Sequence, residues 1–181
     1  AGFSTLFTLL NTGSDPLVGS LILTKSDGAP MDVALSSASA ETSGADFRDP
    51  VPASSADLTI PPGGVRFIEA KPATSADPLI TGWARVESIG GTMGGVATFQ
   101  LQSGEDLIAI AGVLSAAETN VATIPATDDI SLGRYTGYAA ANHGSNSIYI
   151  KIVDVGLNEK DKAMFYGTFG DICDEIFIEN V

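Results

Sequence analysis

The sequence is poor in the residue types from which most catalytic and metal sites are built. Among 181 residues there is one cysteine, Cys173, and one histidine, His143. A single cysteine excludes an intrachain disulfide, and this pair cannot assemble a zinc site without carboxylates. His143 lies in an Asn-x-Gly-Ser turn with no nucleophile motif beside it. We therefore expect a protein that is not an enzyme and holds no transition metal.

Basic residues are also scarce. Nine Lys and Arg stand against 22 Asp and Glu, which gives a formal net charge of -13. Such a charge repels phosphate backbones and anionic lipids, so the sequence predicts no nucleic-acid partner and no membrane insertion. The apolar opening, residues 1–10, is too short to span a bilayer and lacks a basic segment. We expect it to be a first β-strand of a secreted chain whose leader has been removed.

Helical periodicity is nearly absent, whereas alternation of apolar and polar residues recurs along the chain. With 20 Gly and 9 Pro, this pattern predicts an all-β protein, an immunoglobulin-like or jelly-roll β-sandwich of about ten to twelve short antiparallel strands with little helix. The expected strands are 3–11, 17–25, 31–35, 65–70, 80–88, 96–102, 107–113, 120–124, 136–141, 148–154, 163–169 and 175–180.

Two further expectations concern the middle of the chain. Residues 36–56 are small, polar and contain proline, which is typical of a long surface loop, and such a loop is a candidate site of interaction. Trp83 lies in the stretch TGWARV, and we expect its indole to be buried between the two sheets.

An internal repeat relates the two ends of the sequence. At an offset of 131 positions, Asn11 corresponds to Asn142 within Asn-x-Gly-Ser, and Leu21 corresponds to Ile152 in the strand that follows. The second copy is shorter and lacks one strand of the first. The sequence therefore predicts a complete sandwich unit at 1–125 and a partial second copy at 126–181, with a single domain as the alternative.

Several segments in order resemble a known group of modules. These are FSTLFTLLNTGSDPLVGSLILTKSDGAPM, LTIPPGGVRFI, TGWARVES, GGVATFQLQSG, AGVLSAAETN and TGYAAANHGSNS, which together span most of residues 3–155. The combination resembles the immunoglobulin-like β-sandwich repeats of secreted bacterial surface and extracellular proteins. The resemblance implies a non-catalytic structural, adhesive or spacer role outside the cytoplasm. It supplies no catalytic residues, and the sequence departs from it after Asp154.

Two weaker candidate sites lie in the second copy. Asp171, Asp174 and Glu175 are close in sequence and offer oxygen ligands for Ca²⁺, although their spacing does not match a calcium-binding loop. Tyr149 alternates out of phase with the apolar residues around it, which predicts an exposed ring that could contact a glycan or a surface protein.

An incomplete second copy leaves a strand edge to be covered, and unpaired edges recruit other strands. We therefore expect an extracellular structural subunit that assembles into a filament by strand donation between subunits. The alternative is a carbohydrate- or protein-binding adhesive module of a larger secreted protein. Either terminal strand could be the donor, and the expected assembly residues are Phe3, Leu6, Phe7, Leu9 and Leu10 in the first strand and Ile176, Phe177 and Ile178 in the last.

Overall fold

The computed structural model shows an all-β protein. It describes residues 2–39, 49–74, 78–104, 106–117, 119, 128–129, 134–135, 140–142, 150–154 and 176–180. These residues form thirteen strands and no helix. The prediction of an all-β sandwich is confirmed for the first part of the chain, where nine strands form two antiparallel sheets. The chain divides into two compact units, Ala1–Ala117 and Glu118–Val181.

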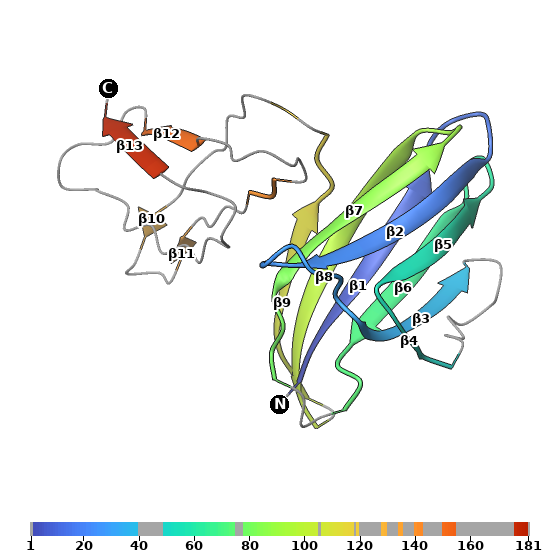
Figure 1. Ribbon diagram of the computed structural model, residues 1–181, viewed down its shortest axis with the longest axis horizontal. Helices are drawn as coiled ribbons and strands as arrows, with labels where there is room; N and C mark the ends of the chain where they lie inside the picture. The colour runs from blue at the N-terminus through green and yellow to red at the C-terminus, as the bar shows by residue number, and fades with distance from the viewer. Residues whose placement is uncertain are drawn as a thin grey trace. The chain divides into compact units, whose positions relative to one another are not determined.

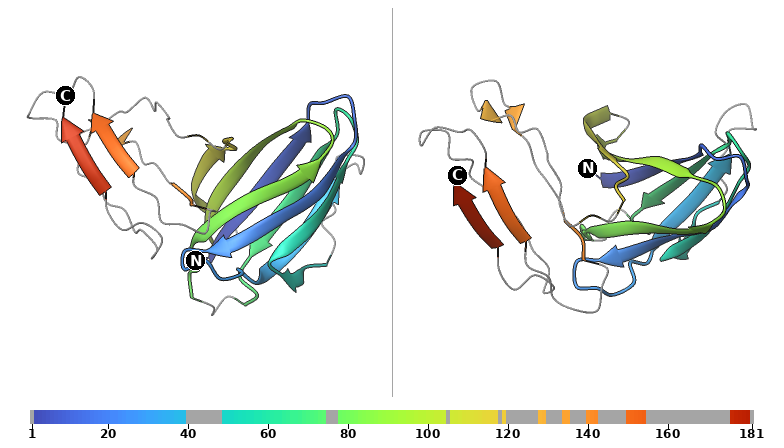
Figure 2. Two further views of the ribbon diagram at one scale, coloured as in Figure 1. Left: turned by 45° about the horizontal axis from the view of Figure 1, so that its top comes forward. Right: turned by 90° about the horizontal axis from the view of Figure 1, so that it is seen from above.

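The first unit is a sandwich of two unequal sheets (Figure 1). The larger sheet has six strands in the order β4-β3-β6-β1-β8-β9, and the smaller has three in the order β5-β2-β7. Seen from two further directions, the two sheets remain separate layers facing each other (Figure 2). The strands are β1 (Gly2–Asn11), β2 (Leu17–Lys25), β3 (Val33–Ser39), β4 (Val51–Ala53), β5 (Ser55–Ile60), β6 (Val65–Lys71), β7 (Gly82–Ile89), β8 (Met93–Ser103) and β9 (Asp106–Leu114).

The core forms where alternate residues of both sheets face inward. In β2 the inward positions include Leu17, Leu21 and Leu23, which are buried, while Val18 points outward and is exposed. This is the period-two pattern expected of a strand with one buried face. The rest of the buried cluster comes from β1, β3, β5 and β6: Phe7, Leu9, Leu35, Leu58, Ile60 and Ile68.

A buried asparagine joins three loops at one end of this core. Asn11 is fully buried, and its side-chain amide donates hydrogen bonds to the carbonyls of Asp15 (2.8 Å) and Ile60 (3.0 Å). Its Oδ1 accepts from the backbone N–H of Gly13 (3.0 Å) and of Thr92 (3.1 Å). All four hydrogen-bonding positions of the amide are therefore used, as a buried polar group requires. The Asn-x-Gly-Ser motif of the first copy is thus a structural brace.

The segment 36–56, expected to be a loop, is partly strand. Strand β3 continues to Ser39, β4 covers Val51–Ala53, and β5 begins at Ser55. The prediction was wrong at residues 36–39, which extend the interior strand β3, and at β4 and β5, which are both edge strands. Edge strands tolerate proline and polar side chains that an interior strand excludes. Residues 40–48 lie outside the described part.

In the second unit the described residues form two small sheets. Strands β10 (Asp128–Asp129) and β11 (Arg134–Tyr135) pair antiparallel, whereas β12 (Ile150–Asp154) and β13 (Ile176–Asn180) pair parallel. The parallel pair departs from the expected all-antiparallel arrangement, and a parallel pair requires a long connection in place of a hairpin. None of the described segments is a helix that could cross a membrane.

Candidate functional site

Both edges of the first strand are already occupied in the chain itself. Strand β1 pairs with β6 along Thr5–Leu10 and with β8 along its whole length. Phe7 and Leu9, two of the expected assembly residues, belong to the core, whereas Phe3 and Leu10 are exposed and Leu6 is half-buried. This placement argues against β1 as a strand donated to a neighbouring subunit, because donation would empty the centre of its own sheet.

The other sequence candidates fall largely beyond what the structure describes. Tyr149 and the acidic group Asp171, Asp174 and Glu175 lie outside the described residues. Ile176, Phe177 and Ile178 lie in β13, where the backbone pairs with Ile150, Lys151 and Ile152 of β12. Within the described part of the chain there is no group of three or more His, Cys, Asp or Glu that could hold a metal ion.

Trp83 does not lie between the sheets. In the β2–β7 ladder it is opposite Thr24, and the next residue of β7, Ala84, is opposite the buried Leu23. Trp83 therefore belongs to the outer face of the three-stranded sheet, where it is half-buried. The guanidinium of Arg85 lies 5.9 Å from the centre of the indole ring, and Arg85 also pairs with Glu87 at 2.8 Å. The expected burial was wrong because alternation alone does not say which face is inward.

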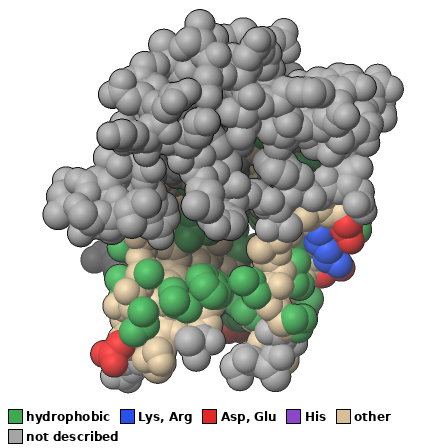
Figure 3. Space-filling model, turned by 90° about the vertical axis from the view of Figure 1, so that its left-hand side faces the viewer, with side chains coloured by type: hydrophobic (Ala, Val, Ile, Leu, Met, Phe, Trp, Pro, Cys, Tyr) green, Lys and Arg blue, Asp and Glu red, His purple; other side chains and the backbone are tan. Residues whose placement is uncertain are grey.

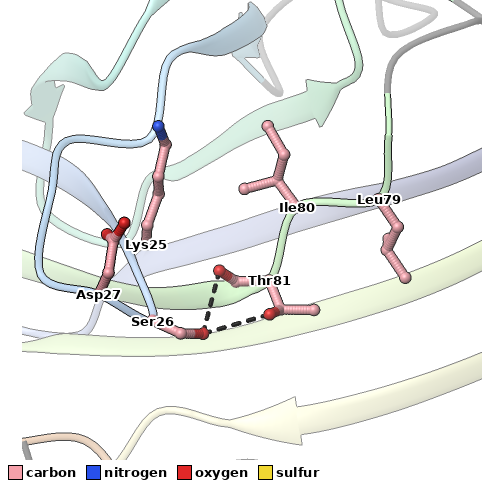
Figure 4. Close-up of a pocket in the computed structure, with 6 residues that line it drawn as sticks. All are labelled: Lys25, Ser26, Asp27, Leu79, Ile80 and Thr81. Carbon is pink, nitrogen blue, oxygen red and sulfur yellow. Dashed lines mark hydrogen bonds between the residues drawn. The ribbon is translucent and has the colours of Figure 1, made fainter. Parts of the chain in front are cut away.

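An open depression lies near the end of β2. The hydroxyl of Ser26 lies 3.2 Å from both the carbonyl oxygen and the hydroxyl of Thr81 (Figure 4). Asp27 accepts a hydrogen bond from the backbone N–H of Ala29 at 2.9 Å. These polar groups stabilise the turn and the chain beside it. The residues that line the depression are Lys25, Ser26, Asp27, Leu79, Ile80 and Thr81. The hydroxyl of Ser26 bonds to Thr81 and not to Lys25 or Asp27, so the hydrogen bonds here hold the chain and do not pair a hydroxyl with a base.

The six-stranded sheet extends beyond its cover at the β8–β9 end. The buried core cluster draws on β1, β2, β3, β5 and β6, and β8 adds only the half-buried Met93 and Ala97. On the same face further along, Phe99 of β8 and Val113 of β9 are 44% and 54% exposed. Among the described residues nothing covers this part of the sheet face, which makes this end of the sheet the least protected part of the first unit as described.

Strand β9 is exposed along its entire length and on both faces. All nine residues are exposed, and Asp106 is its one charged residue. Ile110 and Leu114 project from one face with 60% and 79% of their surface accessible, while Val113 projects from the other. On the side of the molecule to which this strand belongs, hydrophobic side chains gather over the described surface (Figure 3). Within the described residues, β9 pairs with β8 alone.

The other three edges of the sandwich carry the features by which sheets avoid unwanted pairing. Strand β4 has three residues, of which Pro52 has no N–H to donate. Strand β5 presents Asp57, and β7 carries Arg85 and Glu87. Short length, proline and charge are the usual protections of an edge strand. Strand β9 is nine residues long, contains no proline and has its charge at one end.

The direction of the backbone groups on β9 follows from its pairing with β8. The N–H of Ser115 donates to the carbonyl of Gly95 at 2.8 Å, so the residues in phase with Ser115, among them Val113 and Ala111, direct their backbone groups toward β8. The alternate residues direct their backbone N–H and C=O groups to the open edge of the sheet; these are Ile110, Gly112 and Leu114. A β-bulge shifts the register between Leu101 and Gln102, before this regular stretch.

No family model, curated protein or solved structure matches this chain. The fold and the edge of β9 therefore stand on the structure alone. The sequence did contain a signal for this edge, because DLIAIAGVL is apolar at successive positions where the other strands alternate. The strand itself was predicted at 107–113, whereas assembly was expected at the first and last strands of the chain.

Proposed function

We propose that this protein is a non-catalytic extracellular structural protein, a β-sandwich subunit that assembles by pairing strands between subunits. The observation that carries this proposal is the contrast among the four edges of the first unit. Three edges are short or charged, and the fourth, β9, is long, apolar and exposed. An unprotected edge recruits another strand, since each added strand satisfies backbone groups and covers apolar side chains.

The apolar side chains of β9 explain why pairing would be favourable in water. Ile110, Val113 and Leu114 each expose more than half of their surface. Covering an apolar side chain contributes about 25 cal/mol for each Å² removed from water, and a strand beside β9 would cover such side chains on both faces. A catalytic role has no comparable support among the described residues, where the open depression near β2 shows no hydrogen bond between the Ser26 hydroxyl and a basic group.

The extracellular location is part of the proposal and rests on the sequence. The ordered resemblance of residues 3–155 to bacterial surface modules supports it, as does the acidic composition, which keeps an exported protein soluble. A filament would require a second contact besides β9, because a single pairing of identical edges closes into a dimer.

A pair of matched variants tests the proposal. Ile110 on β9 and Val51 on β4 are equally exposed, at 60%, and both lie on edge strands of the same sheet. We expect the wild-type chain to show concentration-dependent assembly in size-exclusion chromatography with light scattering. Ile110→Lys should leave a monomer, because it places a charge on the pairing edge, and Val51→Lys should assemble like the wild type. A wild-type chain that stays monomeric from micromolar to millimolar concentration contradicts the proposal.

A second candidate function has one observation in its favour. The outer face of the three-stranded sheet presents Trp83 beside the charged pair of Arg85 and Glu87. An indole ring with polar groups next to it is a common way to hold a sugar, so the chain could instead be a carbohydrate-binding adhesive module. That function predicts a rise in melting temperature with oligosaccharides, lost in Trp83→Ala, while assembly is unaffected.

A further inference from the structure

We infer that the strand that pairs with β9 is β9 of a second copy of this chain, antiparallel, with a two-fold axis at Gly112. This inference rests on the proposed function and names its partner. The two six-stranded sheets would then join edge to edge into one continuous sheet. The interface is isologous, because the same residues contribute from both copies.

The choice of partner follows from what a second copy can offer. Its strand β4 is three residues long with a central proline, so it can pair with fewer residues of β9 than the five, 110–114, that a second β9 meets about Gly112. Its β5 would place Asp57 in the ladder, and its β7 would place Arg85 and Glu87 there. Each of these pairings would bring charged side chains against the apolar Ile110 and Leu114, at a desolvation cost. Among the edges of the first unit, β9 is the best match for itself.

The backbone directions determine which registers are possible. Every second residue of β9 directs its N–H and C=O groups to the open edge, namely Ile110, Gly112 and Leu114. To form hydrogen bonds, these residues must lie opposite residues of the second strand whose backbone groups also point to its open edge. With the axis at Gly112, each Gly112 faces its counterpart and each Ile110 faces Leu114 of the second copy. The two large side chains of each pair lie on the same face of the joined sheet and cover each other.

The position of the charges and of the bulge favours this axis over its neighbours. Asp106 lies outside the overlap, at opposite ends of the joined strands, so the two Asp106 do not face each other. An axis nearer the start of β9 would place Ile108, the extra residue of the bulge, in the ladder. Gly112 has no side chain on the axis, and a Cβ there would meet only Val96 Cγ2 at 3.6 Å, an ordinary contact.

The interface is small, which determines how it should behave. A strand pair of this length buries less than the roughly 1,200 Å² at the lower limit of stable protein complexes. The dimer should therefore be weak and reversible, formed at high concentration and lost on dilution.

Disulfide trapping tests the register in the full chain, with Cys173→Ser as the background. Ile110→Cys and Leu114→Cys are made as separate chains. In the proposed register, residue 110 of one copy lies about 5.5 Å from residue 114 of the other, within reach of a disulfide. The two copies of residue 110 lie four residues apart along the joined strands, so their Cα atoms are about 13 Å apart, which is too far for a disulfide.

Under mild oxidation we expect neither Ile110→Cys nor Leu114→Cys to form a covalent dimer alone. An equal mixture of the two should form one, and Gly112→Cys should form one by itself. As a control, Val51→Cys mixed with Leu114→Cys should give none. If Ile110→Lys abolishes assembly but the mixture does not cross-link, β9 pairs with something other than its counterpart and the inference is overturned while the proposed function stands. If light scattering shows only monomer, the proposed function fails as well.

Discussion

The two ends of the six-stranded sheet differ in how they meet water. At one end, β3 and β6 are covered by the smaller sheet, their inward residues Leu35 and Ile68 are buried, and the edge is closed by the short β4. At the other end, β9 lies beyond the cover, and all nine of its residues are exposed. Both ends are built from the same kind of antiparallel ladder.

Because both ends have the same kind of antiparallel ladder and differ in exposure, strand pairing by itself does not explain why β9 is exposed. A short, proline-containing strand ends the sheet at β4, and charged side chains lie on both edges of the smaller sheet. The same protections would fit at β9, because surface positions tolerate charge at little cost in stability. Their absence from one edge is what makes that edge a candidate interface.

The largest expected effect is on the free energy of unfolding, when an isoleucine side chain is truncated at each end of the six-stranded sheet. Ile68 is completely buried and Ile110 is 60% exposed. Ile68→Ala should lower the free energy of unfolding by about 4 kcal/mol, because it leaves a cavity in the core. Ile110→Ala should change it by less than about 0.5 kcal/mol. Urea unfolding of both variants at a concentration where the chain is monomeric provides the measurement, and equal losses would show that β9 is buried in solution.

The next effect concerns the brace between the loops. Asn11→Ala should cost about 3 kcal/mol, since it removes four hydrogen bonds and leaves buried backbone groups such as the carbonyl of Ile60 without a partner. Thr12→Ala is the control, because Thr12 is exposed and its hydroxyl makes one hydrogen bond, to Thr92. A loss below about 1 kcal/mol in Asn11→Ala would mean that water replaces the amide.

A smaller effect is expected from salt. Two copies, each with a formal charge of -13, repel each other, and raising the ionic strength from 0.01 M to 0.1 M shortens the screening length from about 30 Å to about 10 Å. Apolar pairing at β9 should therefore strengthen several-fold, seen as a lower dissociation constant in analytical ultracentrifugation. Weakening with added salt would instead indicate an interface held by opposite charges.

The smallest effect is expected at β4. Pro52→Val restores a backbone N–H and a β-branched side chain to this edge. Because β4 remains three residues long, self-association should change by less than about twofold. Strong new association, abolished by Val51→Lys in the same chain, would show that proline and not strand length protects this edge.

Local sequence pattern was sufficient for the strands that alternate. The expected 17–25 coincides with β2 (Leu17–Lys25), and 65–70 differs from β6 by one residue. It was insufficient for β4 and β5, whose composition is that of a loop, because an edge strand needs few apolar residues of its own. The face of Trp83 was also beyond local pattern, since it depends on which side of β2 meets the larger sheet.

The sequence by itself determined the class of this protein: alternation and turn residues led to a β-sandwich, and the shortage of cysteine, histidine and basic residues disfavoured metal, catalytic and nucleic-acid sites. Only the tertiary structure decided which strands lie inside and which lie at the edges. Strand β1 carries five large apolar side chains, as β9 does, but long-range pairing with β6 and β8 encloses β1, while β9 has β8 on one side only within the described residues. Sheet order depends on contacts between residues far apart in the chain, which local periodicity does not encode.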